Sequence, residues 1–507
     1  MSNVDNKRLI RNIVVLYLRM LLVMGIGLYT VRAILHQLGV VDYGIYNVVG
    51  GVVSMFSFLS NTLATSSQRY FSIELAKGDM RSLNQWFCLN ITSFAIIILV
   101  FVLIAETVGL WFVNTQMTIP AERMFAANVV YQFSIVSFCI NFINIPYNAL
   151  IIAHERMSIF AYFSIIDAIL KLIIVFLISI STYDRLIVYA ILIFLVSCLN
   201  TIFYVIYNTR KFQESRFHFY WNTAEFKELL GFSGWHFLGT SANVIRSQGV
   251  NILLNIFFNP AINAARAVAF QVYYAISQLS GNFFTAAKPQ IYKSYAAGEM
   301  DSLYGLIIRS SILSSFLVSI LLFPIFSNTN FVLSLWLKEM PDHVVLFTQL
   351  VMINGLIDST NGPFVAAALA TGKIRRFQIL VSVPTLLNLP ISYLALKLGY
   401  GPEYTMLISI ILSFVTLFVR AFLLHEMIGI SLKDINWMYV KIMIATIVLW
   451  FINYLTIYNK ATTLVNLILY SIFSAGIVVM VYISLVFSKH DRKALVKVVK
   501  AKKDAFF

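Results

Sequence analysis

Residues 160–182 read FAYFSIIDAILKLIIVFLISIST, an apolar run that contains one acidic and one basic residue. A helix of about 20 residues crosses the roughly 30 Å hydrocarbon core of a bilayer, whereas a membrane strand needs only about 10. Since lipid offers no hydrogen bonds to the backbone, runs of this length favour closed helices over a β-barrel. Together with similar runs elsewhere, they predict an all-α integral membrane protein with about 14 transmembrane helices, near 10–35, 43–66, 87–111, 124–150, 160–182, 186–208, 232–256, 262–287, 304–326, 344–369, 378–397, 403–425, 438–457 and 464–487.

The composition excludes a soluble protein. Of the 507 residues, 60% are hydrophobic and 12% are charged, so a soluble fold of this length would have more apolar surface than it buries. The cysteines Cys88, Cys139 and Cys198 each lie inside an apolar run, and their spacing predicts neither disulfides nor a metal site. We therefore expect no metal and no cofactor. The first run carries Arg19 and lacks a small-residue cleavage pattern, which favours a retained helix over a signal peptide.

The net charge of +15 is explained by basic residues in the cytoplasmic loops of a membrane protein and does not indicate a nucleic-acid partner. If the N-terminus is cytoplasmic, most basic residues fall in cytoplasmic segments, and this imbalance places both termini inside with an even number of helices. The basic tail 488–507 either anchors the topology as a solvated segment or lies on anionic cytoplasmic lipids. The outer loops then hold only Arg123, Arg185, Lys338, Lys397 and Lys460.

Two stretches of sequence recur in the second half of the chain. AKGDMRSL at 76–83 is echoed by AAGEMDSL at 296–303, and NIPY at 144–147 by NGPF at 361–364. Two matches at nearly the same offset predict two lobes of six helices with one orientation, which are expected to enclose the substrate site. The predicted parts are an N-terminal lobe, a C-terminal lobe that repeats it, two additional transmembrane helices and the tail, at 1–215, 216–435, 436–487 and 488–507.

Several ionisable side chains fall inside the predicted spans. A charge at the bilayer centre costs about 2.5–3.5 kcal/mol on insertion scales, so such residues are candidates for function. If the basic ones share one lumen, they form a cationic ladder that suits an anionic headgroup, because guanidinium binds phosphate oxygens in a bidentate fork. These residues are Arg19, Arg32, Asp167, Lys171, Arg246, Arg266 and Asp358.

Alternatives remain open for most of these residues. Arg32 either lines the lumen or snorkels to the outer interface. Asp167 and Lys171, four residues apart on one helix, either neutralise each other or bind substrate or protons. Asp358 is a candidate ion or proton site, or else it makes an interhelical hydrogen bond. Arg19, Arg246, Arg266 and Lys171 are the charged substrate-binding candidates, and Asp167 and Asp358 are the ion-coupling candidates.

Polar stripes on two spans are further candidates. Span 232–256 is the least lipid-like and carries Asn243, and span 262–287 carries Gln271 and Gln278 at helical spacing. Amides suit sugar hydroxyls, although the same groups commonly join helices to one another. We predict that these three side chains bind substrate.

Four motifs resemble one known family. They are RLIRN at 8–12, LGVVDYGIY at 38–46, SQRY at 67–70 and INAARAVA at 262–269. Over Arg8 to Phe487 the chain resembles the Wzx-type polysaccharide flippases of the multidrug/oligosaccharidyl-lipid/polysaccharide (MOP) exporter superfamily. The resemblance implies a MATE-like fold with a basic, two-lobed cavity, and Arg266, which lies in a matching motif, as a headgroup contact.

The same resemblance implies a substrate and a location. The substrate is an undecaprenyl-pyrophosphate-linked oligosaccharide, such as an O-antigen or capsular or exopolysaccharide repeat unit. It would cross from the inner to the outer leaflet of the bacterial cytoplasmic membrane by alternating access. The resemblance leaves the coupling ion open, and a proton gradient, a sodium gradient and the membrane potential are the candidate driving forces. A polysaccharide polymerase and a chain-length regulator are the expected protein partners.

Two other functions are weighed against the flippase. A cation-coupled multidrug or metabolite exporter of the same superfamily would need an acidic lumen, whereas basic residues predominate inside these spans. A membrane enzyme would need a catalytic grouping near an interface, and no paired carboxylates or Ser/His/Asp arrangement emerges from the sequence. We therefore predict a transporter and no enzyme activity.

Overall fold

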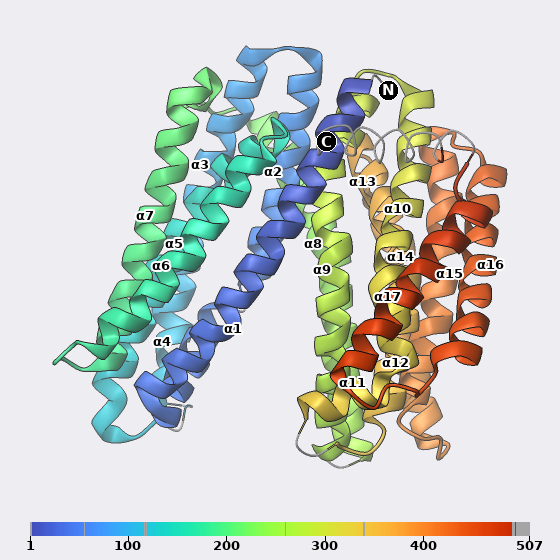
Figure 1. Cartoon of the computed structure of the whole chain (residues 1–507). Helices are drawn as coiled ribbons and strands as arrows, with labels where there is room; N and C mark the ends of the chain where they lie inside the picture. The colour runs from blue at the N-terminus through green and yellow to red at the C-terminus, as the bar shows by residue number, and fades with distance from the viewer. Residues whose placement is uncertain are drawn as a thin grey trace, which may run out of the picture. The chain divides into compact units, whose positions relative to one another are not determined.

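The computed structural model describes residues 3–54, 56–115, 117, 119–258, 260–337, 340–488 and 492, apart from certain side chains in helices α1, α2, α8 and α9, most of them in α1. Within these residues the chain is helical and has no strand (Figure 1). The predicted spans lie in helical parts of the chain, although 43–66 runs from α1 into α2 and 344–369 from α12 into α13. The predicted all-α membrane fold is confirmed. The count of 14 is approximate, because nine of the described helices are long and apolar enough to cross a membrane.

The chain divides into two compact units. The N-terminal unit comprises Met1–Phe237 with Tyr292–Gly298, and the C-terminal unit comprises Leu238–Ile291 with Glu299–Phe507. Helices α8 (Thr223–Phe257) and α9 (Pro260–Ala296) each contribute residues to both units. The predicted division at 215/216, with 436–487 as a separate pair, stays a prediction.

The N-terminal unit consists of helices whose apolar faces pack into several clusters. One cluster joins Tyr70, Phe87 and Tyr147 from three helices, and Tyr70 also stacks on Trp86 with ring centroids 4.0 Å apart. The helices are α1 Asn3–Ser54, α2 Ser57–Lys77, α3 Met80–Ile104, α4 Leu110–Thr115, α5 Met124–Ala153, α6 Met157–Ser179 and α7 Arg185–Lys211, with a π-helical turn Ala105–Gly109 and 3₁₀ turns Ala121–Arg123 and Gln213–Ser215.

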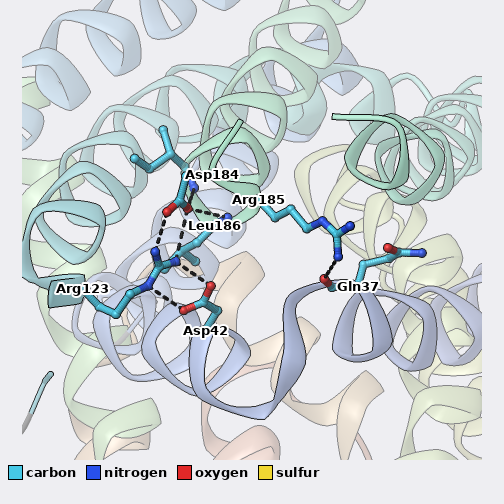
Figure 2. A network of polar contacts seen from close by, with 7 residues as sticks. Gln37, Asp42, Arg123, Asp184, Arg185 and Leu186 are labelled. Carbon is cyan, nitrogen blue, oxygen red and sulfur yellow. Dashed lines mark hydrogen bonds and ion pairs between the residues drawn. The ribbon is translucent and has the colours of Figure 1, made fainter. Parts of the chain in front are cut away.

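Helix α1 bends at Gly39, whose φ of 78° is a left-handed conformation that favours glycine. Just beyond the bend, Asp42 accepts hydrogen bonds from Nε and Nη2 of Arg123, at 2.9 and 2.5 Å (Figure 2). The same guanidinium pairs with Asp184, and Asp184 caps α7 by accepting from the backbone N–H of Leu186 and Ile187. Arg123 thus ties the chain beyond the bend to the start of α7.

The C-terminal unit contains the second half of the chain. Tyr482 is buried and hydrogen-bonds to Ser315 and Ser319 at 2.8 and 3.0 Å, so the last helices pack against α10. Besides parts of α8 and α9, its helices are α10 Met300–Ser327, α11 Thr329–Trp336, α12 Val344–Asp358, α13 Asn361–Thr371, α14 Arg375–Lys397, α15 Tyr404–Ile428, α16 Leu432–Ile457 and α17 Leu464–Val481, with a π-helical turn Tyr482–Val486.

The repeated stretches occupy corresponding turns. Gly78 ends α2 with a φ of 73°, and Gly298 follows α9 with a φ of 72°. The second pair differs: Pro146 lies inside the continuous helix α5, whereas the matching stretch begins at Asn361, directly after a two-residue turn that separates α12 from α13. The second copy is therefore broken where the first is not, and Asp358 is the last residue before the break.

Candidate functional site

The predicted site residues fall in both units. Arg246 and Asn243 lie on α8, Arg266 on α9 and Asp358 on α12, all within the C-terminal unit. Arg19 on α1, and Asp167 and Lys171 on α6, lie in the N-terminal unit. A single lumen shared by all of these residues stays a prediction.

The C-terminal unit contains a polar cavity of about 200 Å³. Three of its lining residues, Arg246, Asp358 and Arg420, carry charge, and most of the others carry hydroxyl or amide groups that hydrogen-bond readily to water or to a polar ligand. In membrane proteins, polar and charged side chains that face a cavity between apolar helices commonly bind the substrate or an ion. Its lining is Asn243, Arg246, Tyr273, Asp358, Asn361, Thr385, Asn388, Leu412, Ser413, Thr416 and Arg420.

Asp358 is held in this cavity by three neutral donors. Its Oδ2 accepts hydrogen bonds from Nδ2 of Asn354 at 2.8 Å and from the hydroxyl of Tyr273 at 3.2 Å. Its Oδ1 accepts from Nδ2 of Asn361 at 3.1 Å, across the break between α12 and α13. The carboxylate is thus fixed by groups from α9, α12 and α13, and the predicted interhelical hydrogen bond is present.

Arg246 and Arg420 interact electrostatically with Asp358 and with each other. Among the described residues, neither arginine makes a hydrogen bond or an ion pair, and Nε of Arg420 is buried without an acceptor. Two guanidinium groups with unused donors therefore line the cavity beside a single carboxylate. The charge of these three groups sums to a net positive value.

Arg266 is held differently. It is 5% exposed, and its guanidinium donates to Oδ1 of Asn251 and, at 3.3 Å, to the backbone carbonyl of Ser247. The same group lies over the ring of Phe270, 4.3 Å from the centroid. A second cavity, of about 40 Å³, is lined by both Arg266 and Arg246. Arg266 therefore joins α8 to α9 while placing a positive charge next to Arg246.

In the N-terminal unit, the guanidinium of Arg19 lies 4.5 Å from the centroid of the Phe160 ring, and its buried Nε has no acceptor within the described part of the chain. Lys171 and Asp167 form an ion pair at 2.8 Å. The pair neutralises itself on the helix, which is one of the two alternatives that the sequence leaves open. A role for either residue in binding substrate or ions stays a prediction.

The amide candidates are less well placed. Asn243 lines the cavity and donates to the carbonyl of Gly239 at 3.3 Å. Gln271 and Gln278 are exposed on α9 and do not line either cavity. Their binding of sugar stays a prediction. The side chain of Arg32 and almost all of the tail 488–507 lie outside the described residues.

Sequence reasoning missed Arg420 and Tyr273. Arg420 lies inside the predicted span 403–425 and is therefore an intramembrane charge of the kind that marks a functional residue. Tyr273 carried no such signal, because a tyrosine among apolar residues is common in a membrane helix. In the described part of the chain, no group of three or more His, Cys, Asp or Glu side chains is placed to hold a metal ion.

Comparison with known proteins gives one family and one fold. The family model of polysaccharide biosynthesis proteins matches residues 9–295. No curated protein matches the sequence significantly. An outward-facing multidrug resistance MATE family transporter of the MOP superfamily is similar in structure, with a TM-score of 0.71 and 12% identity over 82% of this chain and 95% of that one.

Two further solved structures show the same fold. A mutant of the Vibrio cholerae MATE transporter VcmN has a TM-score of 0.68 and 17% identity over 83% of this chain and 97% of its own. A MOP superfamily transporter from Pyrococcus furiosus has a TM-score of 0.64 and 12% identity over 82% and 96%, and it is described as having a binding pocket of reverse polarity that suggests a different function.

Proposed function

The chain belongs to the polysaccharide biosynthesis protein family, and we propose that it is a flippase for an undecaprenyl-pyrophosphate-linked oligosaccharide. The predicted family and the predicted MATE-like fold of the MOP superfamily are confirmed. This family and this fold support a membrane transporter rather than an enzyme. The substrate, the bacterial cytoplasmic membrane as its location and the cytoplasmic position of both termini are parts of the proposal.

The cavity in the C-terminal unit is the observation that supports an anionic substrate. Arg246 and Arg420, which make no hydrogen bond or ion pair among the described residues, offer guanidinium donors beside one carboxylate, Asp358. Guanidinium groups bind phosphate oxygens in bidentate pairs, and such charge-assisted hydrogen bonds are strongest where water is scarce. When a diphosphate headgroup enters this cavity, hydrogen bonds from the guanidinium groups replace those that its oxygens made with water.

Transport by this protein breaks no bond in the substrate. The headgroup and sugar pass through the polar interior while the polyprenyl chain, which is apolar, stays in the lipid. Alternating access then needs inward-open and outward-open states whose populations the substrate shifts by binding them differently. Asp358 and Asp167 are the proposed sites of coupling to a proton or sodium gradient, and a polymerase and a chain-length regulator are the proposed protein partners.

A cation-coupled drug exporter is the competing function within this fold. Such an exporter needs an acidic pocket, and the carboxylate of Asp358 is present, but two arginines outnumber it in the same cavity. The Pyrococcus furiosus transporter is described as having a binding pocket of reverse polarity that suggests a different function. We therefore use the charge of the cavity to choose between an anionic and a cationic substrate. Here the net positive charge favours an anion.

The proposal is tested in proteoliposomes that contain a fluorescent polyprenyl-pyrophosphate oligosaccharide. The wild type is expected to move the label between leaflets, and Arg246→Ala together with Arg420→Ala is expected to stop this movement. Arg376→Ala is the control, because Arg376 is 67% exposed and pairs with Glu426 outside the cavity. Efflux of a cationic drug without movement of the labelled lipid would contradict the proposal.

A further inference from the structure

We propose that Asp358 is a release residue, which competes with the diphosphate group for the arginines of the cavity and so sets how tightly that group is held. This inference rests on the proposed function. It assigns to Asp358 a role in substrate affinity, distinct from the binding of a coupling ion.

The first argument is the way in which the carboxylate is held. Tyr273, Asn354 and Asn361 supply its three hydrogen bonds, and no arginine forms an ion pair with it in the part of the chain that the structure describes. The neutral donors keep the negative charge in place without using the guanidinium N–H groups. The arginines therefore stay available for a second anion, although they already interact with Asp358.

The second argument is the sum of charges. With Asp358 ionised, Arg246 and Arg420 leave one net positive charge for an incoming diphosphate; without it, they leave two. Coulomb interactions between groups in a membrane interior act over several ångströms, because the effective dielectric constant is much lower than that of water. Asp358 therefore repels the bound diphosphate while the arginines attract it, and like-charge pairs of this kind cost a large factor in affinity.

The third argument is the requirement of transport. A carrier must bind its substrate well enough to take it up and weakly enough to let it go, as in channels whose sites bind and release ions. Two unopposed guanidinium groups in a water-poor cavity would hold a diphosphate tightly and slow its release. A carboxylate fixed beside them limits the affinity without removing the specificity of the bidentate contacts.

The break between α12 and α13 adds a structural reason for this choice of residue. Asp358 ends α12, and Asn361, which binds its Oδ1, begins α13. Irregular backbone inside a membrane protein is tolerated where it lines a cavity, as it does here. Because the hydrogen bonds to the carboxylate come from both sides of the break, a change in the angle between α12 and α13 moves the negative charge relative to the arginines.

The test measures binding of inorganic pyrophosphate to the purified full-length protein in nanodiscs by calorimetry. Asp358→Asn is nearly isosteric, and the buried Oδ1 of Asn361, which has no partner in the described part of the chain, is an acceptor available to the new amide. It is expected to bind pyrophosphate about tenfold more tightly or better and to move labelled lipid more slowly. Arg246→Gln and Arg420→Gln are expected to weaken binding about tenfold, and Arg376→Gln to leave it unchanged.

A second variant of Asp358 separates the effect of its charge from an effect on folding. Asp358→Ala removes the same charge with a different side chain, so tighter binding by both variants supports the role of the charge and does not depend on one of them folding well. Unchanged or weaker binding by the variants that fold, with lipid movement lost, would overturn the inference and leave Asp358 as an ion site.

A competition arm distinguishes a lipid headgroup from a free anion. If a polyprenyl pyrophosphate in the nanodisc displaces inorganic pyrophosphate, the ligand is the headgroup. If it does not, while Asp358→Asn still tightens binding, the anion site stands and the proposed flippase function fails. If the lipid displaces pyrophosphate but Asp358→Asn binds no more tightly, the proposed function stands and the release role fails.

Discussion

The hydroxyl of Tyr273 donates to Asp358 at 3.2 Å, and the ring that carries it lies directly against Gly355, one turn earlier on the same helix as the aspartate. A methyl group at Gly355 would lie 3.2 Å from two ring carbons of Tyr273. The absence of a side chain at this position thus lets α9 bring its tyrosine to the carboxylate.

Gly355→Ala is expected to destabilise the protein by about 1–3 kcal/mol, because the ring of Tyr273 must shift to admit the methyl group. The shift also weakens the hydrogen bond to Asp358. The measurement is the Tm of the purified protein in detergent. Gly305→Ala is the matched control: Gly305 lies on α10 with nothing within 4 Å of the added methyl group, so its Tm is expected to stay the same or rise slightly. Equal loss of Tm in both variants would contradict this packing argument.

Arg246 and Arg266 are expected to respond differently to the same substitution. Arg266→Gln removes two hydrogen bonds and the contact with Phe270 from a buried side chain, so the Tm is expected to fall by several degrees. Arg246→Gln removes no hydrogen bond that the structure describes, so its Tm is expected to stay near that of the wild type while lipid movement is lost. Glycan export in a flippase-deficient strain, measured beside the amount of inserted protein, separates the two effects. Full export by Arg246→Gln would contradict its role in the cavity.

The ion pair of Asp167 and Lys171 is tested by a double-mutant cycle. Lys171→Gln alone leaves an uncompensated carboxylate in an apolar helix, which costs up to about 2.5–3.5 kcal/mol on insertion scales and is expected to lower the amount of inserted protein. Asp167→Asn combined with Lys171→Gln removes both charges and is expected to restore insertion. If the pair only neutralises itself, the double variant also exports glycan at the wild-type rate. Restored insertion without export would instead assign one of the two residues to substrate or ion binding.

The Arg123 network at the start of α7 is expected to make stability depend on pH. The hydrogen bond from Arg123 lowers the pKa of Asp184 below its usual value, and the hydrogen bonds from the N–H groups at the start of α7 lower it further. Partial burial acts in the opposite direction but does not outweigh them. The pKa of Asp184 is lower in the folded protein than in the unfolded chain. The stabilisation that the pair contributes is therefore fully present above about pH 4, the pKa range of an unperturbed aspartate, and it is lost as the pH falls through the folded-state pKa.

The corresponding measurement is the Tm of wild type and Arg123→Gln between pH 3 and 7. The variant is expected to be less stable by about 1 kcal/mol at neutral pH, and the difference is expected to shrink in the acid range. Arg185→Gln serves as the control, since within the described residues Arg185 donates to the carbonyl of Gln37, at 3.0 Å, and to no carboxylate (Figure 2). The effect of Arg185→Gln on the Tm is expected to be the same at every pH from 3 to 7. If the effect of Arg123→Gln is equally independent of pH, the pairing of Arg123 with Asp184 is ruled out.

The sequence predicted the fold well, because apolar runs of bilayer length and the recurrence of 76–83 at 296–303 are local signals. Both glycines of that repeat adopt the left-handed conformation that the pattern requires. The motif around Asp42 was recognised only through its resemblance to a family, and the structure adds a physical reason, since Asp42 pairs with Arg123.

The site was predicted less completely. Arg246, Arg266 and Asp358 were identified individually, because a charge in an apolar run stands out. Their grouping with Arg420 and Tyr273 depends on how α8, α9, α12 and α15 pack, which no local pattern encodes. The break after Asp358 was also beyond reach, because the matching stretch around Pro146 forms a continuous helix.

The end of α9 has a consequence for dividing the chain into fragments. Residues 292–298 belong to the N-terminal unit, where Nζ of Lys293 lies 2.8 Å from Oε1 of Glu155, although they follow some 50 residues of the other unit in the chain. A cut near residue 216, at the predicted division, therefore gives a first fragment that lacks part of its own unit and a second fragment that carries this part. Two such halves are expected to need co-expression, and neither is expected to be stable when synthesised alone.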